Sequence, residues 1–177
     1  MQINIIRSDI KQSLAGLRET LSVLDDQRLN TVPFSGSWTA GQTVQHIILS
    51  GMGFVQMING PVEATLRKPD EMAEQIKTIF LDFTIKMKSP DFVVPLDDFY
   101  TKEGLVNTLN ELELSIEQAS QLPDLSPTCL AFKLPVLGNL TRYEALCFIA
   151  YHTRRHLHQL QKIREKLAGQ ETPLYAK

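Results

Sequence analysis

The stretch TRYEALCFIAYHTRRHLHQLQKIREKL, residues 141–167, decides the fold of this chain. Its start has the form of a capping box, because Thr141 is followed three residues later by Glu144. Beyond this start, apolar residues recur at the spacings that place side chains on one stripe of an α-helix. These residues are Ala145, Ile149, Leu160, Ile163 and Leu167. The stretch therefore predicts one long, capped helix with a buried face.

Three further stretches have the same helical periodicity. The first, residues 3–24, carries a stripe that begins at Ile3 and should end near Asp25. The second, residues 40–58, follows another capping box formed by Thr39 and Gln42, and the third spans residues 101–122. With the last helix they predict an all-α four-helix bundle, which occupies residues 1–177 as a single domain.

A fifth apolar pattern lies in the connector between the second and third of these helices. Met72, Ile76, Ile79, Phe80 and Phe83 are spaced as on a short helix. It is either an extra short helix packed outside the bundle or an extension that precedes the third bundle helix. Residues 91–100 are expected to form a loop.

Composition excludes several classes of function. The 177 residues carry a formal net charge of −2, so bulk electrostatics favours neither nucleic acid nor an anionic membrane surface. No apolar run approaches the ~20 residues that a transmembrane helix needs. The start of the chain also lacks the features of a secretory signal. The expected compartment is the cytoplasm, with no nucleic-acid or membrane partner.

Two histidines of the last helix share its buried face. His152 and His156 are one turn apart, and both project into the middle of the apolar stripe. Two histidines at this spacing can supply two ligands to one metal ion. The alternative is that both are core histidines whose nitrogens are satisfied by hydrogen bonds to neighbouring polar groups.

A third ligand has to come from another helix. His158 lies about 200° around the helix from His156 and cannot join the same site, so we expect it in solvent or at an oligomer contact. His46, on the second helix, shares its face with Ser50 and Gly53, which leave room beside it. Taken alone, His46 is equally compatible with a surface or interface histidine.

Two segments resemble the signatures of the DinB/YfiT-like superfamily. Residues 37–48, SWTAGQTVQHII, resemble its tryptophan ahead of the second helix followed by the first metal histidine. Residues 134–160 resemble its glycine-containing turn, capped helix and His-x-x-x-His pair. The resemblance implies a four-helix bundle, a homodimer, and a metal site formed by His46, His152 and His156. The chain departs from the family in extra residues between 61 and 91.

Three histidine ligands leave a position open for water or substrate, the arrangement of a catalytic zinc site. Imidazole suits zinc and nickel equally, and the sequence does not distinguish these divalent metals. Metal-bound water would be the nucleophile, because the ion lowers its pKa. The family's chemistries imply a metal-dependent hydrolase or a transferase of low-molecular-weight thiols such as bacillithiol or mycothiol, acting on a small-molecule substrate.

Other interpretations of the same residues stay open. Gln159 lies near the His152/His156 face, where it either orients a ligand from the second coordination shell or is an ordinary surface amide. No carboxylate stands beside the histidines as a general base, and Glu144 is explained by its cap. The alternative functions are a non-catalytic, metal- or small-molecule-binding stress-response bundle and an oligomeric scaffold. Aromatic residues in or next to the loops at helix ends either line a pocket mouth or close the core: Trp38, Phe34, Phe92, Phe99, Tyr100 and Phe132.

Overall fold

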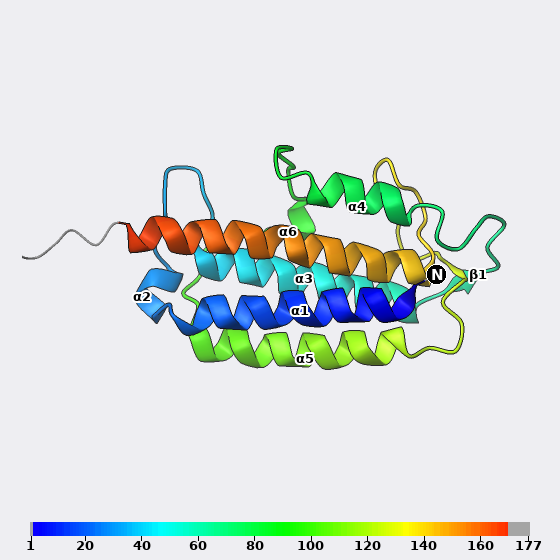
Figure 1. Cartoon of the computed structure of the whole chain (residues 1–177), viewed down its shortest axis with the longest axis horizontal. Coiled ribbons are helices and arrows are strands. Elements are labelled where there is room, and N and C mark those ends of the chain that lie inside the picture. The colour runs from blue at the N-terminus through cyan, green and yellow to red at the C-terminus, as the bar shows by residue number, and fades with distance from the viewer. Residues whose placement is uncertain (1, 170–177) are drawn as a thin grey trace, which may run out of the picture.

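Four long helices form the body of the protein (Figure 1). The computed structural model describes residues 2–169, so residue 1 and residues 170–177 of the expected domain lie outside the described part. The four helices are α1 (Ile3–Ser22), α3 (Ala40–Asn59), α5 (Lys102–Ser120) and α6 (Arg142–Ala168). The all-α four-helix bundle predicted from the sequence is confirmed.

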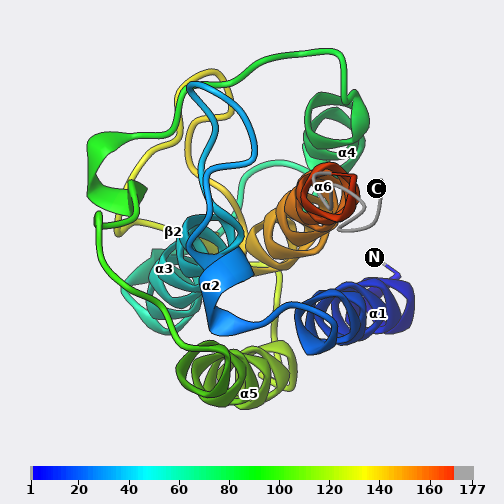
Figure 2. The same cartoon turned by 90° about the vertical axis from the view of Figure 1, so that its left-hand side faces the viewer.

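The helices stand at the corners of a square when the bundle is viewed end on (Figure 2). Helix α6 packs against both α1 and α3, and α5 contacts the same two helices on the opposite side. Helices α1 and α6 run in one direction and α3 and α5 in the other, so the α3–α5 connection returns along the bundle. Among the described residues, no helix combines the length and the apolar character that crossing a bilayer requires.

The apolar stripes predicted from the sequence meet between the helices. Leu14 and Leu17 of α1, Ile47 of α3, Leu109 of α5 and Ile163 of α6 are all fully buried. Each comes from the face that the three- and four-residue spacing predicts. Burial of such side chains contributes roughly 1.5–3 kcal/mol each.

The connector forms an extra helix outside the bundle, which decides between the two alternatives. Helix α4 (Ala73–Leu81) packs on the outer side of α6 and buries Ile76 and Phe80 against it. Residues 91–100 are not loop throughout, because Asp91–Val93 form one turn of 3-10 helix, η1.

Three small elements were not predicted. Helix α2 (Asp26–Leu29) follows α1, and its N-cap Asp25 accepts a hydrogen bond from the Arg28 amide at 2.7 Å. The acidic pair that predicts the end of the first helix therefore also starts a new turn. The strands β1 (Val62–Glu63) and β2 (Thr128–Cys129) pair antiparallel and tie the two long connections together.

Both predicted capping boxes are present. The Thr39 hydroxyl accepts from the Gln42 amide at 3.1 Å, and the Gln42 side chain accepts from the Thr39 amide at 3.0 Å. At α6, Thr141 and Glu144 exchange the same two hydrogen bonds at 3.1 and 2.9 Å. These bonds satisfy amides that a helix start otherwise leaves unpaired.

Glu144 also anchors the connector to the start of α6. Its buried carboxylate accepts two hydrogen bonds from the Arg67 guanidinium, both at 2.6 Å, and one from the Met72 amide at 2.8 Å. A bidentate, charge-assisted pair of this kind is stronger and more directional than a neutral hydrogen bond. The entry to α4 is thereby fixed against α6.

Glu144→Ala should destabilise the protein by about 2–4 kcal/mol, because it leaves two backbone amides and the Arg67 guanidinium without their acceptor. Urea unfolding followed by circular dichroism measures the change. The exposed Glu111 of α5 supplies the control, since Glu111→Ala should alter the free energy of unfolding by less than about 0.5 kcal/mol. Equal effects of the two substitutions would contradict the anchoring role.

Candidate metal centre

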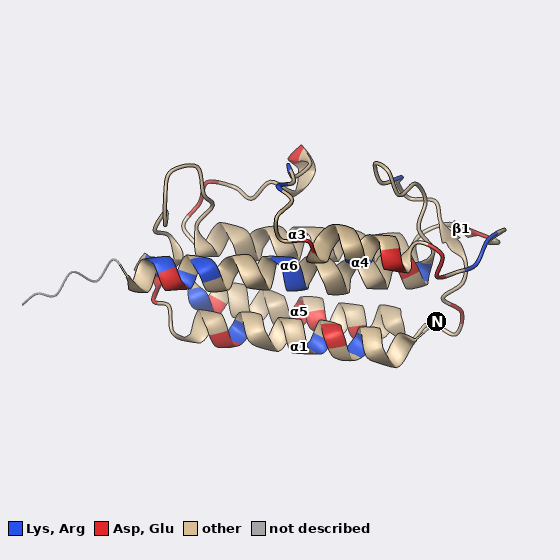
Figure 3. Cartoon of the chain, turned by 45° about the horizontal axis from the view of Figure 1, so that its top comes forward, with Lys and Arg blue, Asp and Glu red and all other residues tan. Residues whose placement is uncertain are grey.

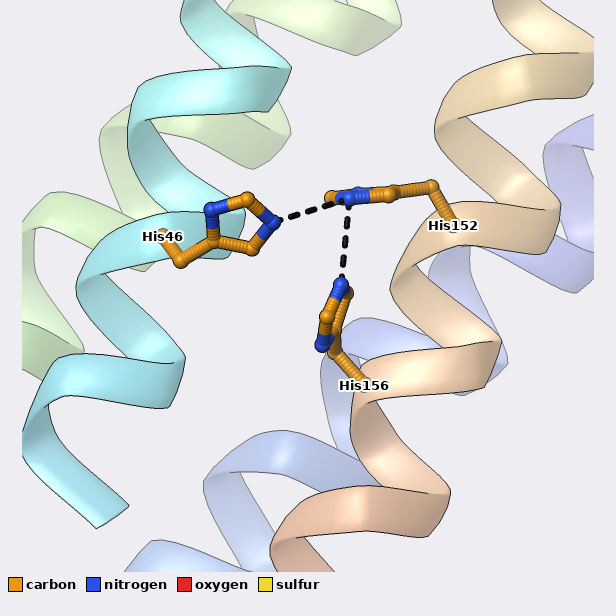
Figure 4. Close-up of side chains that lie close together, drawn as sticks. All are labelled: His46, His152 and His156. Atoms are coloured by element: carbon orange, nitrogen blue, oxygen red, sulfur yellow. Dashed lines mark hydrogen bonds between the residues drawn. The ribbon is translucent and has the colours of Figure 1, made fainter. Parts of the chain in front are cut away.

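Three imidazole rings from two neighbouring helices converge on one point (Figure 4). His46 projects from α3, and His152 and His156 project from α6 one turn apart. The Nε2 atom of His152 lies 3.1 Å from the Nε2 atoms of both His46 and His156. The structure therefore brings together the three residues that the sequence nominates.

The positions of these rings follow from the helix faces that carry them. His46 and His152 are buried, with 3% and 6% of their surface exposed, and His156 is partly buried. On α3, a side chain added at Gly53 would meet no atom within 4 Å. This open space agrees with the expectation that small residues leave room on the His46 face.

Hydrogen bonds at the outer nitrogens fix which way two of the rings present their lone pairs. The Nδ1–H of His46 donates to the Val93 carbonyl at 2.7 Å, and the Nδ1–H of His156 donates to the Gln159 side-chain oxygen at 2.8 Å. A neutral imidazole has one proton, so Nε2 of each ring carries a lone pair directed at His152. Nε2 of His152 can donate its proton to one of them at most, which leaves a lone pair without a partner.

One cation could accept lone pairs from these three nitrogens, whose ligand atoms all lie within 4.8 Å of one another. Imidazole binds zinc at about 2.0–2.1 Å, which separates two ligand nitrogens by roughly 2.8–3.4 Å for bond angles between about 90° and 109°. The observed separations of 3.1 Å fall in that range. The histidine triad can therefore hold one metal ion, with Val93 and Gln159 as the outer hydrogen-bond partners that such ligands usually have.

The electrostatics of the pocket keep the triad neutral. Burial lowers the pKa of His46. Burial also lowers the pKa of His152 well below its ordinary value near 6.5, and the neighbouring His156 and His46 lower it further. Burial and the charge of His46 lower the pKa of His156 to about 3. Neutral imidazole is the form that binds metal, so no proton has to be displaced near pH 7.

Aromatic side chains surround two of the ligands. The Trp38 ring centroid lies 5.0 Å from that of His46, and Phe148 stacks on His152 at 5.2 Å. Phe80 of α4 presents its edge to His152 at 5.6 Å. All three rings also line the pocket beside the triad, so the ligands are bordered by an apolar wall.

The triad lines a broad pocket. Its lining comes from α3, α4 and α6 and from the loops around residues 33–38, 83–93 and 132–137. Of the loop aromatics named from the sequence, Trp38, Phe34, Phe92 and Phe132 line this pocket. Tyr100 instead packs over Gly41, within 2.8 Å of the position that a Cβ would take there.

The remaining candidates fall outside the triad. His158 does not join it, as its position around α6 predicts, and its ring is partly buried and stacks on Phe83 with centroids 4.2 Å apart. Glu144 is engaged in its cap and with Arg67. Gln159 accepts a hydrogen bond from His156, the contact that its ligand-orienting interpretation requires.

The Val93 carbonyl was not found from the sequence. It is a backbone atom 47 residues from His46, contributed by the turn η1 of the connector. Backbone acceptors leave no residue-type signal, and the extra segment between residues 61 and 91 gave no indication that the chain returns to the site.

Comparison with known proteins identifies the family of the chain. The family model of the DinB superfamily matches residues 9–160, and the chain belongs to that superfamily. The chain is 25% identical over 152 residues to the uncharacterized protein YuaE of Bacillus subtilis (strain 168), an alignment that covers 83% of this chain and 90% of that protein. No solved structure matches.

Acid should destabilise the metal-free protein through these histidines. Their folded-state pKa values are depressed, so below about pH 6.5 the unfolded chain binds protons that the folded protein does not. The stability that neutral histidines contribute is complete above that pH and is lost as the pH falls, by up to about 1.4 kcal/mol per pH unit and histidine.

Urea unfolding of EDTA-treated protein between pH 6.5 and 5 measures this slope before most carboxylates titrate. His152→Gln should reduce the slope by about one third, because one of the three groups is removed. His158→Gln, which changes a histidine outside the triad, should leave most of it. A flat profile in the unsubstituted protein would contradict the assignment.

Gln159→Ala should weaken metal binding about 10–100-fold, because it removes the acceptor that orients His156. Titration with zinc in competition with a chelator measures the affinity. Gln161, two residues further along α6, serves as the control, and Gln161→Ala should bind zinc as the unsubstituted protein does. Equal affinities for all three proteins would show that Gln159 is a surface amide only.

Proposed function

We propose that this protein is a metal-dependent enzyme that binds one zinc or nickel ion through His46, His152 and His156. The observation that carries the proposal is the direction of the three Nε2 atoms, which face one another at the wall of a pocket. A buried group of lone pairs is costly unless a cation binds it. Three protein ligands also leave room for a further ligand from the pocket side.

A divalent ion held here would supply Lewis acidity and lower the pKa of a bound water or thiol. The side chains of the protein have a different part. Val93 and Gln159 hold two ligands in one tautomer, and Phe80 and Phe148 cover the third. A substrate enters from the side where the pocket is open.

The lining of the pocket favours thiol transfer over hydrolysis. Hydrolysis needs an acceptor for the proton of the attacking water. Among the described lining residues outside the triad, the possible acceptors are Glu165, nine residues beyond His156 on α6, and His158, which lies about 200° around the helix from His156. A thiol that has lost its proton to solvent needs no such base. Its sulfur forms a bond to an electrophilic carbon, and the leaving group departs with the electron pair of the broken bond.

Metal analysis tests the site. Untagged protein should contain about one equivalent of zinc or nickel, and His152→Ala/His156→Ala should contain little, because two of the three ligands are gone. His158→Ala is the matched control and should keep its metal. Helical circular dichroism checks that each variant folds. Protein that takes up neither ion after incubation with both would refute the metal site.

Turnover separates the enzyme from a non-catalytic binding protein. Cysteine and 1-chloro-2,4-dinitrobenzene serve as the thiol and the electrophile, and 4-nitrophenyl acetate tests hydrolysis. Conjugation that is faster with metal-loaded protein than with the double histidine variant would support transfer. Metal-loaded protein without activity on either pair would favour a non-catalytic metal- or small-molecule-binding bundle.

A further inference from the structure

The pocket beside the triad differs chemically at its two ends along α6. Phe148 precedes His152 by one turn, whereas Lys162 and Lys166 follow His156, and all of these residues line the same pocket. At a rise of ~1.5 Å per residue, Phe148 lies about 6 Å before His152 along the helix axis and Lys162 about 9 Å beyond His156. The triad therefore lies between an apolar region and a basic region.

The apolar region is a cluster of four rings, which we call the phenylalanine cluster: Phe54, Phe80, Phe132 and Phe148. Phe54 of α3 stacks on Phe148 with centroids 4.0 Å apart, and Phe80 of α4 meets Phe148 edge-on at 4.7 Å. Because Phe148 also stacks on His152, an apolar segment resting on the cluster would reach the triad directly.

The basic region lies along α6, where the exposed Lys162 and Lys166 form what we call the lysine group. The exposed Lys86 and Lys88 also line the pocket, from the connector between α4 and η1, whose basic stretch appears in blue above the middle of α6 (Figure 3). Glu165 is the one carboxylate among the described lining residues, so positive charge is in excess in the lining.

Local structure does not account for these lysines. Lys166 lies in the last turn of α6, where a cation complements the helix dipole. Lys162 precedes that turn, and Lys86 and Lys88 lie in irregular chain, so the dipole does not stabilise them. The remaining lining cation, Arg155, is engaged elsewhere, because its guanidinium donates to the backbone carbonyls of Phe80 and Asp82.

The ligand set adds to the excess of positive charge. Three imidazoles are neutral ligands, so they do not balance the charge of a divalent ion. With one carboxylate and four lysines in the described lining, the pocket attracts a negatively charged ligand.

We propose that the substrate is an anionic amphiphile. Its apolar segment rests on the phenylalanine cluster, its acidic group lies at the lysine group, and its reactive centre lies between them beside His152 and His156. This inference rests on the proposed function in taking the pocket as the substrate site. The axial spacing of about 21 Å from Phe148 to Lys162, less the reach of a lysine side chain, suits an extended molecule on the order of 15 Å long.

Calorimetry with 8-phenyloctanoate and its uncharged amide tests the inference. Both probes are titrated into EDTA-treated and zinc-loaded protein. The carboxylate should bind about tenfold more tightly than the amide in both states, because the lysines attract it whether or not an ion is present. The preference should decline with added salt.

Substitutions assign the two ends of the probe. Lys162→Gln/Lys166→Gln should lower the affinity for the carboxylate to that for the amide and leave the amide unchanged. Phe132→Ala should weaken both probes by a similar factor. Lys11→Gln/Lys77→Gln removes the same charge outside the pocket lining and should bind like the unsubstituted protein.

Several results would overturn the inference. These are equal binding of the two probes, no binding of the carboxylate, or unchanged discrimination in the Lys162/Lys166 variant. A preference that arises in zinc-loaded protein alone and survives loss of the lysines would assign recognition to the ion. If the protein takes up no metal, the proposed function is refuted. If that protein still prefers the carboxylate to the amide, the inference about the pocket is upheld, so the two failures are distinguishable.

Discussion

The packing of α3 against α6 is the contact on which both the fold and the site depend. Helix α6 contacts α1, α3 and α4, so it belongs to the bundle and to the added layer at once. Where α3 lies beside it, His46 faces His152, with Trp38 packed against the first ring and Phe148 stacked on the second. The convergence of the three nitrogens thus follows from the packing of two helices, and a mobile loop supplies none of the ligands.

The sequence predicts well whatever depends on local chemistry. Periodic apolar residues predict the four long helices. The Thr39/Gln42 and Thr141/Glu144 capping boxes predict the first residue of two of them. The face shared by His152 and His156 follows from helix geometry alone. His46 is different, because no rule of spacing relates it to a helix more than a hundred residues away, and the family resemblance supplied that link.

The sequence does not predict the contacts between residues that lie far apart along the chain. The position of α4 on α6 depends on the Arg67–Glu144 pair, and nothing in the residues around Arg67 indicates its partner. The outer partner of His46 is a peptide carbonyl, which every residue possesses. Lys86 and Lys88 look like ordinary solvated charges in the sequence, and only the structure places them in the lining of the pocket.

The connector is attached near both of its ends, by Arg67 to the start of α6 and by the Val93 carbonyl to His46. Between these attachments it forms one wall of the pocket but contributes no ligand. The three histidines thus lie on the bundle, whereas the connector supplies pocket wall only. Lengthening a surface segment costs little free energy when its ends are already fixed. The wall can therefore diverge in length and composition among related proteins while the bundle and its three histidines stay the same.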